Sequence, residues 1–288
     1  MTLRKSLTAI LIGVTLIVAV GTAGSSGMWD RFSLPPIVIC VSSALIVQWA
    51  AFYFAWRRHS ERFFDLIGSM TFVMVIAIAI GGSRHNLGWL DLACGTAVIL
   101  WALRLGTFLY LRIRSVGEDK RFQVIKWQMP WFLMTWTLQA VWVVGTSGAV
   151  LSVVGDGRAQ QIGPIEGFGL SVWMVGFLIE IVADEQKRRF RLAQPSKTSF
   201  ISTGLWGRTR HPNYFGEILL WSGLAITVLP SLAGWQLATL ASPVFVWILL
   251  TKISGIPILE AAANNRWGQD PKYLAYTKRT PLLLPRIW

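Results

Sequence analysis

The sequence predicts an all-α fold, a polytopic bundle of membrane-spanning helices. Hydrophobic residues make up 53% of the chain and charged residues only 14%. Apolar runs recur along its whole length, and each is long enough to cross about 30 Å of hydrocarbon. Because lipid offers the backbone no hydrogen-bond partners, runs of this kind fold as helices. This composition excludes a soluble globular protein.

Eight membrane spans are expected along the chain. Their approximate bounds are 7–25, 34–56, 63–82, 90–111, 131–153, 165–184, 212–229 and 235–256. Pro212 suits the first position of the seventh helix, where its missing N–H is not needed. Pro257 is expected to break or kink the last helix near its end, just before Glu260. Gly167 and Gly169, which open the sixth span, are interpreted as packing residues.

The first span admits two interpretations. Arg4 and Lys5 precede an apolar run, and small residues follow at 21–25, so the segment fits either an uncleaved helix or a signal peptide. We expect the uncleaved helix. The chain then divides into an N-terminal helix and loop at 1–33 and a membrane domain at 34–288.

The net charge of +13 reflects orientation in the membrane rather than binding to nucleic acid. If the N-terminus is cytoplasmic, most basic residues fall in the cytoplasmic connections. The opposite side then holds only Arg31, Arg84 and Arg158. This positive-inside pattern places both termini in the cytoplasm. The long charged segments 112–130, 185–211 and 257–288 lie on that face, so a site for a polar ligand is expected there.

The segment 205–217, LWGRTRHPNYFGE, points to an anion site. It brings three basic side chains, an amide, a phenol and a carboxylate to the start of the seventh span. A carboxylate such as Glu217 inside a span costs a few kcal/mol unless it is paired or solvated, so it is usually functional. The helix that begins at Pro212 turns its N–H groups toward the basic cluster, an arrangement that holds phosphate.

A polar stripe ends the sixth span. It consists of Glu180, Asp184, Arg188 and Arg191. Spacings of four, four and three residues place the four on one face if the helix continues to Arg191. Asp184 is expected to pair with Arg188, and Glu180 with a group from another helix. The stripe suits a ligand site and an interfacial cluster equally well, whereas the basic residues at 187 and 189 favour the membrane interface.

Further charged residues lie in or beside other apolar segments. Arg104 lies about two turns inside the fourth span, so it pairs with a carboxylate at 65, 180 or 217 or lines a polar cavity. Glu61 and Asp65 are four residues apart at the start of the third span. Asp65 is followed at once by apolar residues, and a desolvated carboxyl suits a proton donor.

No metal site is expected. Cys40 and Cys94 both lie in apolar segments and form no CxxC pair. His59, His85 and His211 are far apart in sequence, and no metal-ligand spacing joins them to carboxylates.

Six motifs in matching order resemble the steroid 5α-reductase-like family of membrane proteins, in its bacterial DUF1295-type branch. They are WALRL (101–105), GEDKRF (117–122), GFLIEIVADEQKRRF (176–190), GLWGRTRHPNYFGE (204–217), SGIPILE (254–260) and RWGQDPKYLAYTKRTPLLLP (266–285). The resemblance covers residues 61–285. It implies a seven-helix core with NADPH held on the cytoplasmic side and an apolar substrate slot open to lipid, preceded here by one extra helix.

The resemblance also implies which residues bind the cofactor. Those on the family's cofactor positions are Arg104, Arg112, Arg114, Asp184, Arg188, Arg191, Asn213, Tyr214, Glu217 and Glu260. Arginines suit the pyrophosphate and the 2′-phosphate. The amide and the carboxylates suit the nicotinamide and the ribose.

The family's chemistry reduces a carbon–carbon double bond conjugated to a ketone. Hydride passes from C4 of NADPH to the β-carbon, an acidic group polarises the carbonyl oxygen, and the α-carbon takes a proton. In the steroid enzymes a glutamate and a tyrosine hold that oxygen. Here the glutamate position falls near Glu61 or Asp65, and Trp101 stands at the tyrosine position. An indole donates a hydrogen bond but delivers no proton, so Trp101 does not replace the tyrosine that holds the steroid's carbonyl oxygen. Another enone or a polyisoprenoid-type lipid therefore suits the chain as a substrate as well as a steroid does.

The leading hypothesis is therefore an NADPH-dependent enone reductase in the bacterial inner membrane, with its cofactor site facing the cytoplasm. Its expected partners are a lipid-soluble substrate and membrane lipids, without nucleic acid, and the chain is compatible with a monomer. One alternative is an S-adenosylmethionine-dependent methyltransferase of a lipid or an isoprenylcysteine, which shares RHPNY but leaves GEDKRF unexplained. Another is a non-enzymatic transporter or lipid-binding protein, disfavoured because the charges concentrate on one side.

Overall fold

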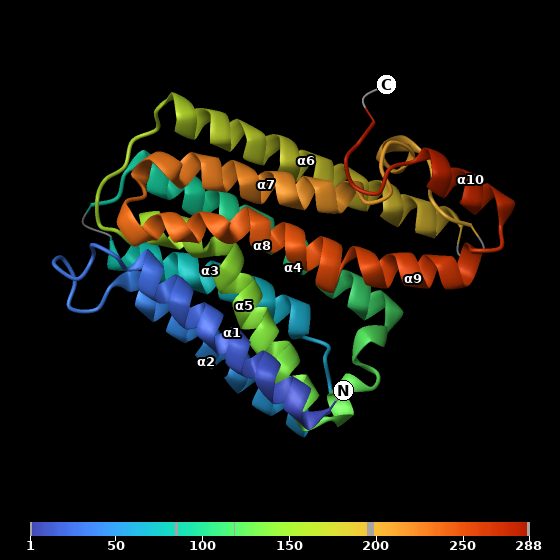
Figure 1. Cartoon of the computed structure of the whole chain (residues 1–288), viewed down its shortest axis with the longest axis horizontal. Coiled ribbons are helices and arrows are strands. Elements are labelled where there is room, and N and C mark those ends of the chain that lie inside the picture. The colour runs from blue at the N-terminus through green and yellow to red at the C-terminus, as the bar shows by residue number, and fades with distance from the viewer. Residues whose placement is uncertain (1, 84–85, 118, 195–198, 287–288) are drawn as a thin grey trace. The chain divides into compact units, whose positions relative to one another are not determined.

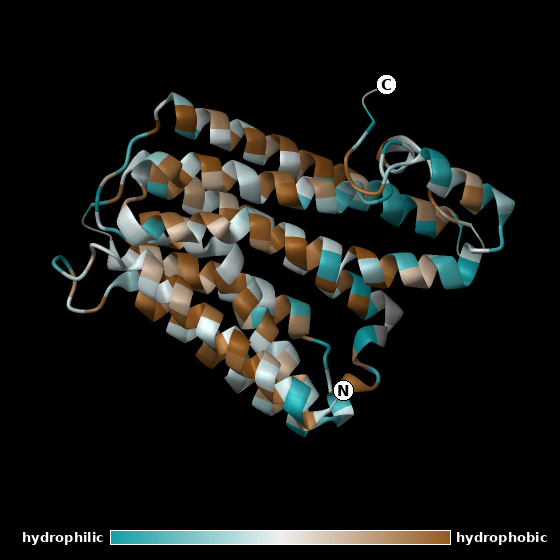
Figure 2. Ribbon diagram, in the orientation of Figure 1, coloured by the Kyte–Doolittle hydropathy of each residue, from teal (hydrophilic) through white to brown (hydrophobic). Residues whose placement is uncertain are grey.

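The computed structural model describes residues 2–83, 86–117, 119–194 and 199–286, and this part of the chain is helical without strands. Eight of its helices are long and apolar enough to cross a membrane. They lie at the eight predicted spans, although the sixth and eighth end at Ala193 and Trp267 rather than at 184 and 256, so the chain is a polytopic helical membrane protein (Figure 1). Figure 2 shows that the long helices are mostly hydrophobic and that hydrophilic residues gather toward helix ends and in α10.

Ten α-helices follow one another along the described residues. They are α1 (Leu3–Gly24), α2 (Pro36–Arg57), α3 (Phe64–Gly82), α4 (Trp89–Val116), α5 (Met129–Val154), α6 (Pro164–Ala193), α7 (Pro212–Val228), α8 (Ser242–Ile248), α9 (Ile256–Trp267) and α10 (Pro271–Arg279). Helix α7 begins at Pro212 as predicted. Helix α6 continues past Arg191, which is the condition that the predicted polar stripe required.

The eighth span is a composite rather than one regular helix. A 3₁₀ segment at Gly234–Ala241 leads into α8, and a π-helical turn at Leu249–Ile253 follows. Helix α9 then starts at Ile256 with Pro257 in its first turn, where a missing N–H is tolerated. The predicted break before Glu260 is therefore confirmed.

The chain divides into two compact units. The first comprises Met1–Glu166 and Val228–Ser242, and the second comprises Gly167–Thr227 and Pro243–Trp288. The boundary at 33 predicted from the sequence falls inside the first unit, in which α1 packs against α5 and α2.

Helix α5 forms the centre of the first unit. It packs against α1, α2, α3 and α4, and 78% of its apolar window is buried. A helix that is hydrophobic on every side belongs in such a position. Glycines allow α1 to approach closely, since a Cβ on Gly13 would lie 3.1 Å from the Val141 side chain.

Helices α6 and α7 lie side by side in the second unit (Figure 1), and glycines line the seam between them. Gly169 and Gly176 line it on α6, and Gly216 and Gly223 line it on α7. A Cβ on Gly176 would lie 2.5 Å from the backbone nitrogen of Leu220, closer than real Cβ contacts allow. Membrane helices use small residues in this way to bring their backbones into contact. The packing role predicted for Gly169 is confirmed, whereas Gly167 has no heavy atom within 4 Å of its Cβ position.

Candidate functional site

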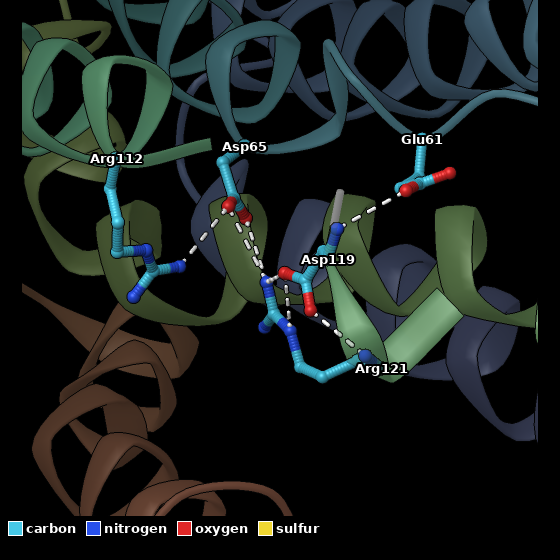
Figure 3. Close-up of polar contacts among 5 residues, drawn as sticks. All are labelled: Glu61, Asp65, Arg112, Asp119 and Arg121. Carbon is cyan, nitrogen blue, oxygen red and sulfur yellow. Dashed lines mark hydrogen bonds and ion pairs between the residues drawn. The ribbon is translucent and has the colours of Figure 1, made fainter. Parts of the chain in front are cut away.

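Asp65, in the first turn of α3, joins two arginines of the first unit (Figure 3). Its Oδ2 lies 3.4 Å from Nη2 of Arg121 and 3.9 Å from Nη2 of Arg112. The Asp65 side chain is 13% exposed, and both guanidinium groups are partly open to solvent. Both ion pairs are long, so the carboxylate is neighboured by cations without being tightly bound to either.

Arg121 is held more firmly by Asp119 (Figure 3). Its Nε and Nη2 donate to Asp119 Oδ2 at 2.8 and 2.5 Å, and its backbone N–H donates to Asp119 Oδ1 at 2.9 Å. Burial opposes ionisation of Asp119, but the hydrogen bonds and the charge of Arg121 outweigh it and hold the pKa of this carboxyl below its usual value. Asp119 therefore fixes Arg121 beside Asp65.

Glu61 ties the same loop to the start of α3. It is buried, and it accepts hydrogen bonds from the Asp119 N–H at 3.2 Å and from Nζ of Lys126 at 3.1 Å. Phe122 anchors the middle of the loop, because it is 2% exposed within an aromatic cluster that includes Phe64. Through these two contacts Glu61 joins the loop, at Asp119 and Lys126, to the start of α3.

Helix α4 carries four of the predicted site residues. Trp101 is 1% exposed and contacts Phe72 edge to face at 5.1 Å. The guanidinium of Arg104 lies 5.6 Å from the ring centroid of Phe108. Arg112 and Arg114 lie in the last turns of this helix, which extends five residues beyond the predicted span end at 111. Of the GEDKRF motif, Glu118 lies outside the described residues.

A basic pocket of about 200 Å³ opens within the second unit. Its cations are Lys187, Arg191, Arg210 and Arg266, beside His211 and Glu260. Its aromatic residues are Phe200, Trp206, Trp267, Tyr273 and Tyr276. The pocket thus combines a surplus of positive charge with several ring faces.

Trp206 organises the wall that faces α6. Its indole N–H donates to the carbonyl oxygen of Ala183 at 3.0 Å, and its own carbonyl oxygen accepts from the Tyr276 hydroxyl at 2.7 Å. Nζ of Lys187 lies 4.4 Å above its ring, a cation–π contact. The C-terminal part of α6, together with α10, therefore positions this wall.

Glu260 of α9 bridges the two residues that precede α7. Its Oε2 accepts from Nη1 of Arg210 at 2.5 Å, and its Oε1 lies 2.8 Å from Nε2 of His211. Burial lowers the pKa of His211; the charges of Lys187 and Arg210 act in the same direction, and Glu260 opposes them. His211 is therefore neutral at pH 7.

The other predicted residues of the second unit lie on α6 and α7. Asp184 and Glu217 are buried, at 6% and 7% exposure. The ring of Tyr214 stacks on His211 with centroids 5.8 Å apart. Oδ1 of Asn213 is buried and has no hydrogen-bond partner in the described part of the chain.

Of this predicted set, Arg191 and Glu260 line the basic pocket. Arg188 instead pairs with Glu185 at 2.7 Å, one turn away on the exposed side of α6. Lys187 lines the pocket, although its sequence position favours the membrane interface. Arg210 and His211 line it too, and both belong to the segment 205–217 that predicts an anion site, although no individual role was predicted for either.

Comparison with known proteins gives the same family that the motifs indicate. A family model described as "Protein of unknown function (DUF1295)" matches residues 51–280. The 3-oxo-5-alpha-steroid 4-dehydrogenase 1 of Bos taurus is 29% identical over 119 residues, and that of Macaca fascicularis is 33% identical over 122 residues. The aligned segments cover 41% and 42% of this chain and 40% of each relative, so the chain spans about two fifths of the length of these relatives. No solved structure matches the chain.

Proposed function

The chain belongs to the DUF1295 family, and on that basis we propose that it is a membrane-embedded, NADPH-dependent reductase. Its substrate is a lipid-soluble molecule with a carbon–carbon double bond conjugated to a ketone, steroid-like or isoprenoid-like. The similarity to 3-oxo-5-alpha-steroid 4-dehydrogenases supports the reaction class. The cofactor site faces the cytoplasm, in line with the positive-inside distribution of charge.

The observation that carries the proposal is the donor set of the basic pocket. Four permanent cations face one carboxylate, a balance that favours a ligand with several negative charges. Arginine forks suit phosphate oxygens, and aromatic faces suit a purine ring. The phosphate-bearing end of NADPH has both features. Arg191, Arg210, Arg266 and Lys187 would hold the phosphates, and the aromatic residues of the pocket would contact the purine ring.

The same donor set disfavours the methyl-transfer alternative. S-adenosylmethionine carries a positively charged sulfonium centre and no phosphate, so four cations would repel it rather than attract it. A transporter would need polar groups that continue across the bilayer. The clusters described above instead gather at the loop beside α3 and in the pocket.

Bound NADPH would supply the hydride for the β-carbon. The part of the chain is then to polarise the carbonyl oxygen and to transfer one proton, and Asp65 is the stronger candidate for the group that exchanges this proton, with Arg121 as the neighbouring hydrogen-bond donor. Both oxygens of Glu61 are already engaged by the Asp119 N–H and Lys126. Nη2 of Arg121 also donates to both oxygens of Asp65, but at the longer distances of 3.5 and 3.4 Å. Trp101 serves as a buried wall of the site rather than as a source of protons.

The direct test is ligand binding to the purified full-length chain in detergent. Quenching of tryptophan fluorescence, to which Trp206 and Trp267 in the pocket contribute, would be followed during titration with NADPH and with S-adenosylmethionine. We expect saturable binding of NADPH and a much weaker response to the methyl donor. Binding of S-adenosylmethionine without binding of NADPH would overturn the proposal in favour of methyl transfer.

A further inference from the structure

His211 is placed in the basic pocket so that one ring nitrogen is bonded and the other is not. The residue is 4% exposed, and its Nε2 lies 2.8 Å from Oε1 of Glu260. Because a carboxylate only accepts hydrogen bonds, Nε2 carries the proton of the neutral ring. Nδ1 is buried and has no hydrogen-bond partner among the residues that the structure describes.

The surroundings of His211 oppose a second proton on its ring. The groups around it come from four helices and the segment before α7: Lys187 and Arg191 from α6, Arg210 beside it in sequence, Tyr214 from α7, Glu260 and Arg266 from α9, and Tyr273 and Tyr276 from α10. Only Glu260 among these charged groups is negative. Burial and the neighbouring cations lower the pKa of the imidazole. A proton on Nδ1 would also create a buried N–H without an acceptor.

A bound anion would remove both obstacles at once. Its negative charge would offset the repulsion from Lys187 and Arg210, and its oxygen atoms would offer acceptors for a newly formed N–H. The protonated ring would in turn add a fifth positive charge to the pocket. Binding of the anion and binding of the proton therefore favour each other, and thermodynamic linkage requires the coupling to be mutual.

We propose that binding of a multiply charged anion in the basic pocket is coupled to uptake of one proton by His211. The proposal deepens the proposed function, because it concerns the pocket assigned there to the phosphates of NADPH. It requires only that the pocket bind an anion, and it makes cofactor affinity respond to pH.

The coupling has a definite signature. Anion affinity rises as pH falls, by up to tenfold per pH unit, over the range between the pKa of His211 in the free protein and its higher value in the complex. Outside this range the affinity no longer depends on His211. The variant His211→Gln keeps a donor in the site but takes up no proton, so its affinity should lose this dependence.

The experiment uses the full chain in detergent and inorganic sulfate as the probe. Sulfate keeps both charges throughout the range of about pH 5 to 8 in which histidines titrate, so it contributes no proton of its own. Affinity is measured by tryptophan fluorescence, and proton uptake by calorimetry in two buffers of different ionisation enthalpy. The matched control is His59→Gln, because His59 lies in the first unit and stacks on Trp127.

We expect proton uptake in the wild type and in His59→Gln, and none in His211→Gln. Equal pH dependence in all three proteins, or sulfate binding without proton uptake, would overturn the proposal. If His211→Gln does not fold, Glu260→Gln decides the question. It keeps an oxygen for Nε2 but removes the negative charge, so the pH-dependent range should move to lower pH, and an unchanged range would count against the coupling.

A parallel titration with NADPH separates this inference from the proposed function. NADPH binding without any effect of His211 on its pH dependence would leave the reductase standing and remove the coupling. Sulfate binding with proton uptake, but no binding of NADPH, would do the reverse. No binding of either anion would contradict both.

Discussion

The hydroxyl of Tyr276 in α10 donates a buried 2.7 Å hydrogen bond to the backbone carbonyl oxygen of Trp206. Seventy residues separate the two partners in sequence. The bond holds the short 3₁₀ turn Gly204–Gly207, and with it the indole wall of the basic pocket, against the C-terminal helix. Because the donor is a phenol, this hydrogen bond is lost when the Tyr276 hydroxyl ionises.

Tyr276→Phe should lower the stability of the second unit. The carbonyl oxygen of Trp206 would lose its donor, which costs about 1 to 3 kcal/mol in the free energy of unfolding. Thermal unfolding of the purified chain, followed by tryptophan fluorescence, would measure the change. Tyr273→Phe is the matched control, because Tyr273 contacts the rings of Phe200 and Trp267. A loss in the control as large as in Tyr276→Phe would show that the hydrogen bond is not the cause.

Stability should also fall at alkaline pH, because burial raises the pKa of Tyr276 to about 12. The folded chain holds this proton more tightly than the unfolded chain, in which the pKa of the tyrosine hydroxyl is 10.0. The stabilisation is therefore complete below pH 10 and is lost as pH rises toward 12. We expect the Tm of the wild type to drop across this window more than the Tm of Tyr276→Phe. If the Tm of the two proteins fell by the same amount between pH 10 and pH 12, the alkaline loss of stability would not be due to Tyr276.

Arg191→Ala should weaken NADPH far more than NADH if Arg191 holds the 2′-phosphate. A charge-assisted hydrogen bond contributes about 1.5 to 3 kcal/mol, so the loss for NADPH is on the order of 10- to 100-fold in Kd. Arg189→Ala is the control, because Arg189 lies on the same helix but is 76% exposed and pairs with Glu185. Equal losses for both nucleotides would refute a 2′-phosphate role.

Asp65→Asn should separate chemistry from binding. If Asp65 manages the proton, kcat for a lipid-soluble enone falls by about 100-fold or more, while the Kd of NADPH stays close to that of the wild type. Asp119→Asn is the comparison variant, because it leaves Asp65 intact but weakens the hold on Arg121. The carboxylate of Asp119 accepts hydrogen bonds from the side chain and from the backbone N–H of Arg121. An equal fall in kcat for both variants would assign Asp65 a positioning role alone.

Gly176→Ala should destabilise the seam between α6 and α7. The added Cβ would meet the backbone nitrogen of Leu220 at 2.5 Å, and overpacking of this kind costs about 1 to 3 kcal/mol. Gly167→Ala on the same helix meets nothing within 4 Å and should be neutral or stabilising by up to about 1 kcal/mol. The two Tm values in detergent give the comparison. If Gly176→Ala is as stable as the wild type, α6 and α7 can move apart to accommodate the added Cβ at little cost in free energy.

Local features of the sequence were enough to predict the helices. The lengths of the apolar runs predicted eight spans, Pro212 predicted the start of α7, and Pro257 indicated the break before α9. The composite eighth span was not predicted, because the hydropathy of residues 235–256 does not distinguish α, 3₁₀ and π turns. The end of α4 was placed too early, since Arg112 and Arg114 are helical but polar.

The candidate site was predicted in outline only, because its partners are distant in sequence. Asp65 and Arg121 are 56 residues apart, and His211 and Glu260 are 49 apart. Spacing rules describe neighbours on one helix; they led us to expect Asp184 as the partner of Arg188, and the structure shows an ion pair of Arg188 with Glu185 at 2.7 Å. Lys187 was assigned to the interface because nothing local shows that Trp206 folds back beneath it.

The glycine seam has a consequence for how a ligand could enter the second unit. The backbones of α6 and α7 are in contact at these glycines, so a shift of one helix along the other would bring side chains against main-chain atoms, and we expect the two helices to move together. The wall contributed by α9 follows a π-helical turn instead. Because Glu260 of α9 is bonded to Arg210 and His211, a movement of α9 that widened the pocket would have to break both contacts.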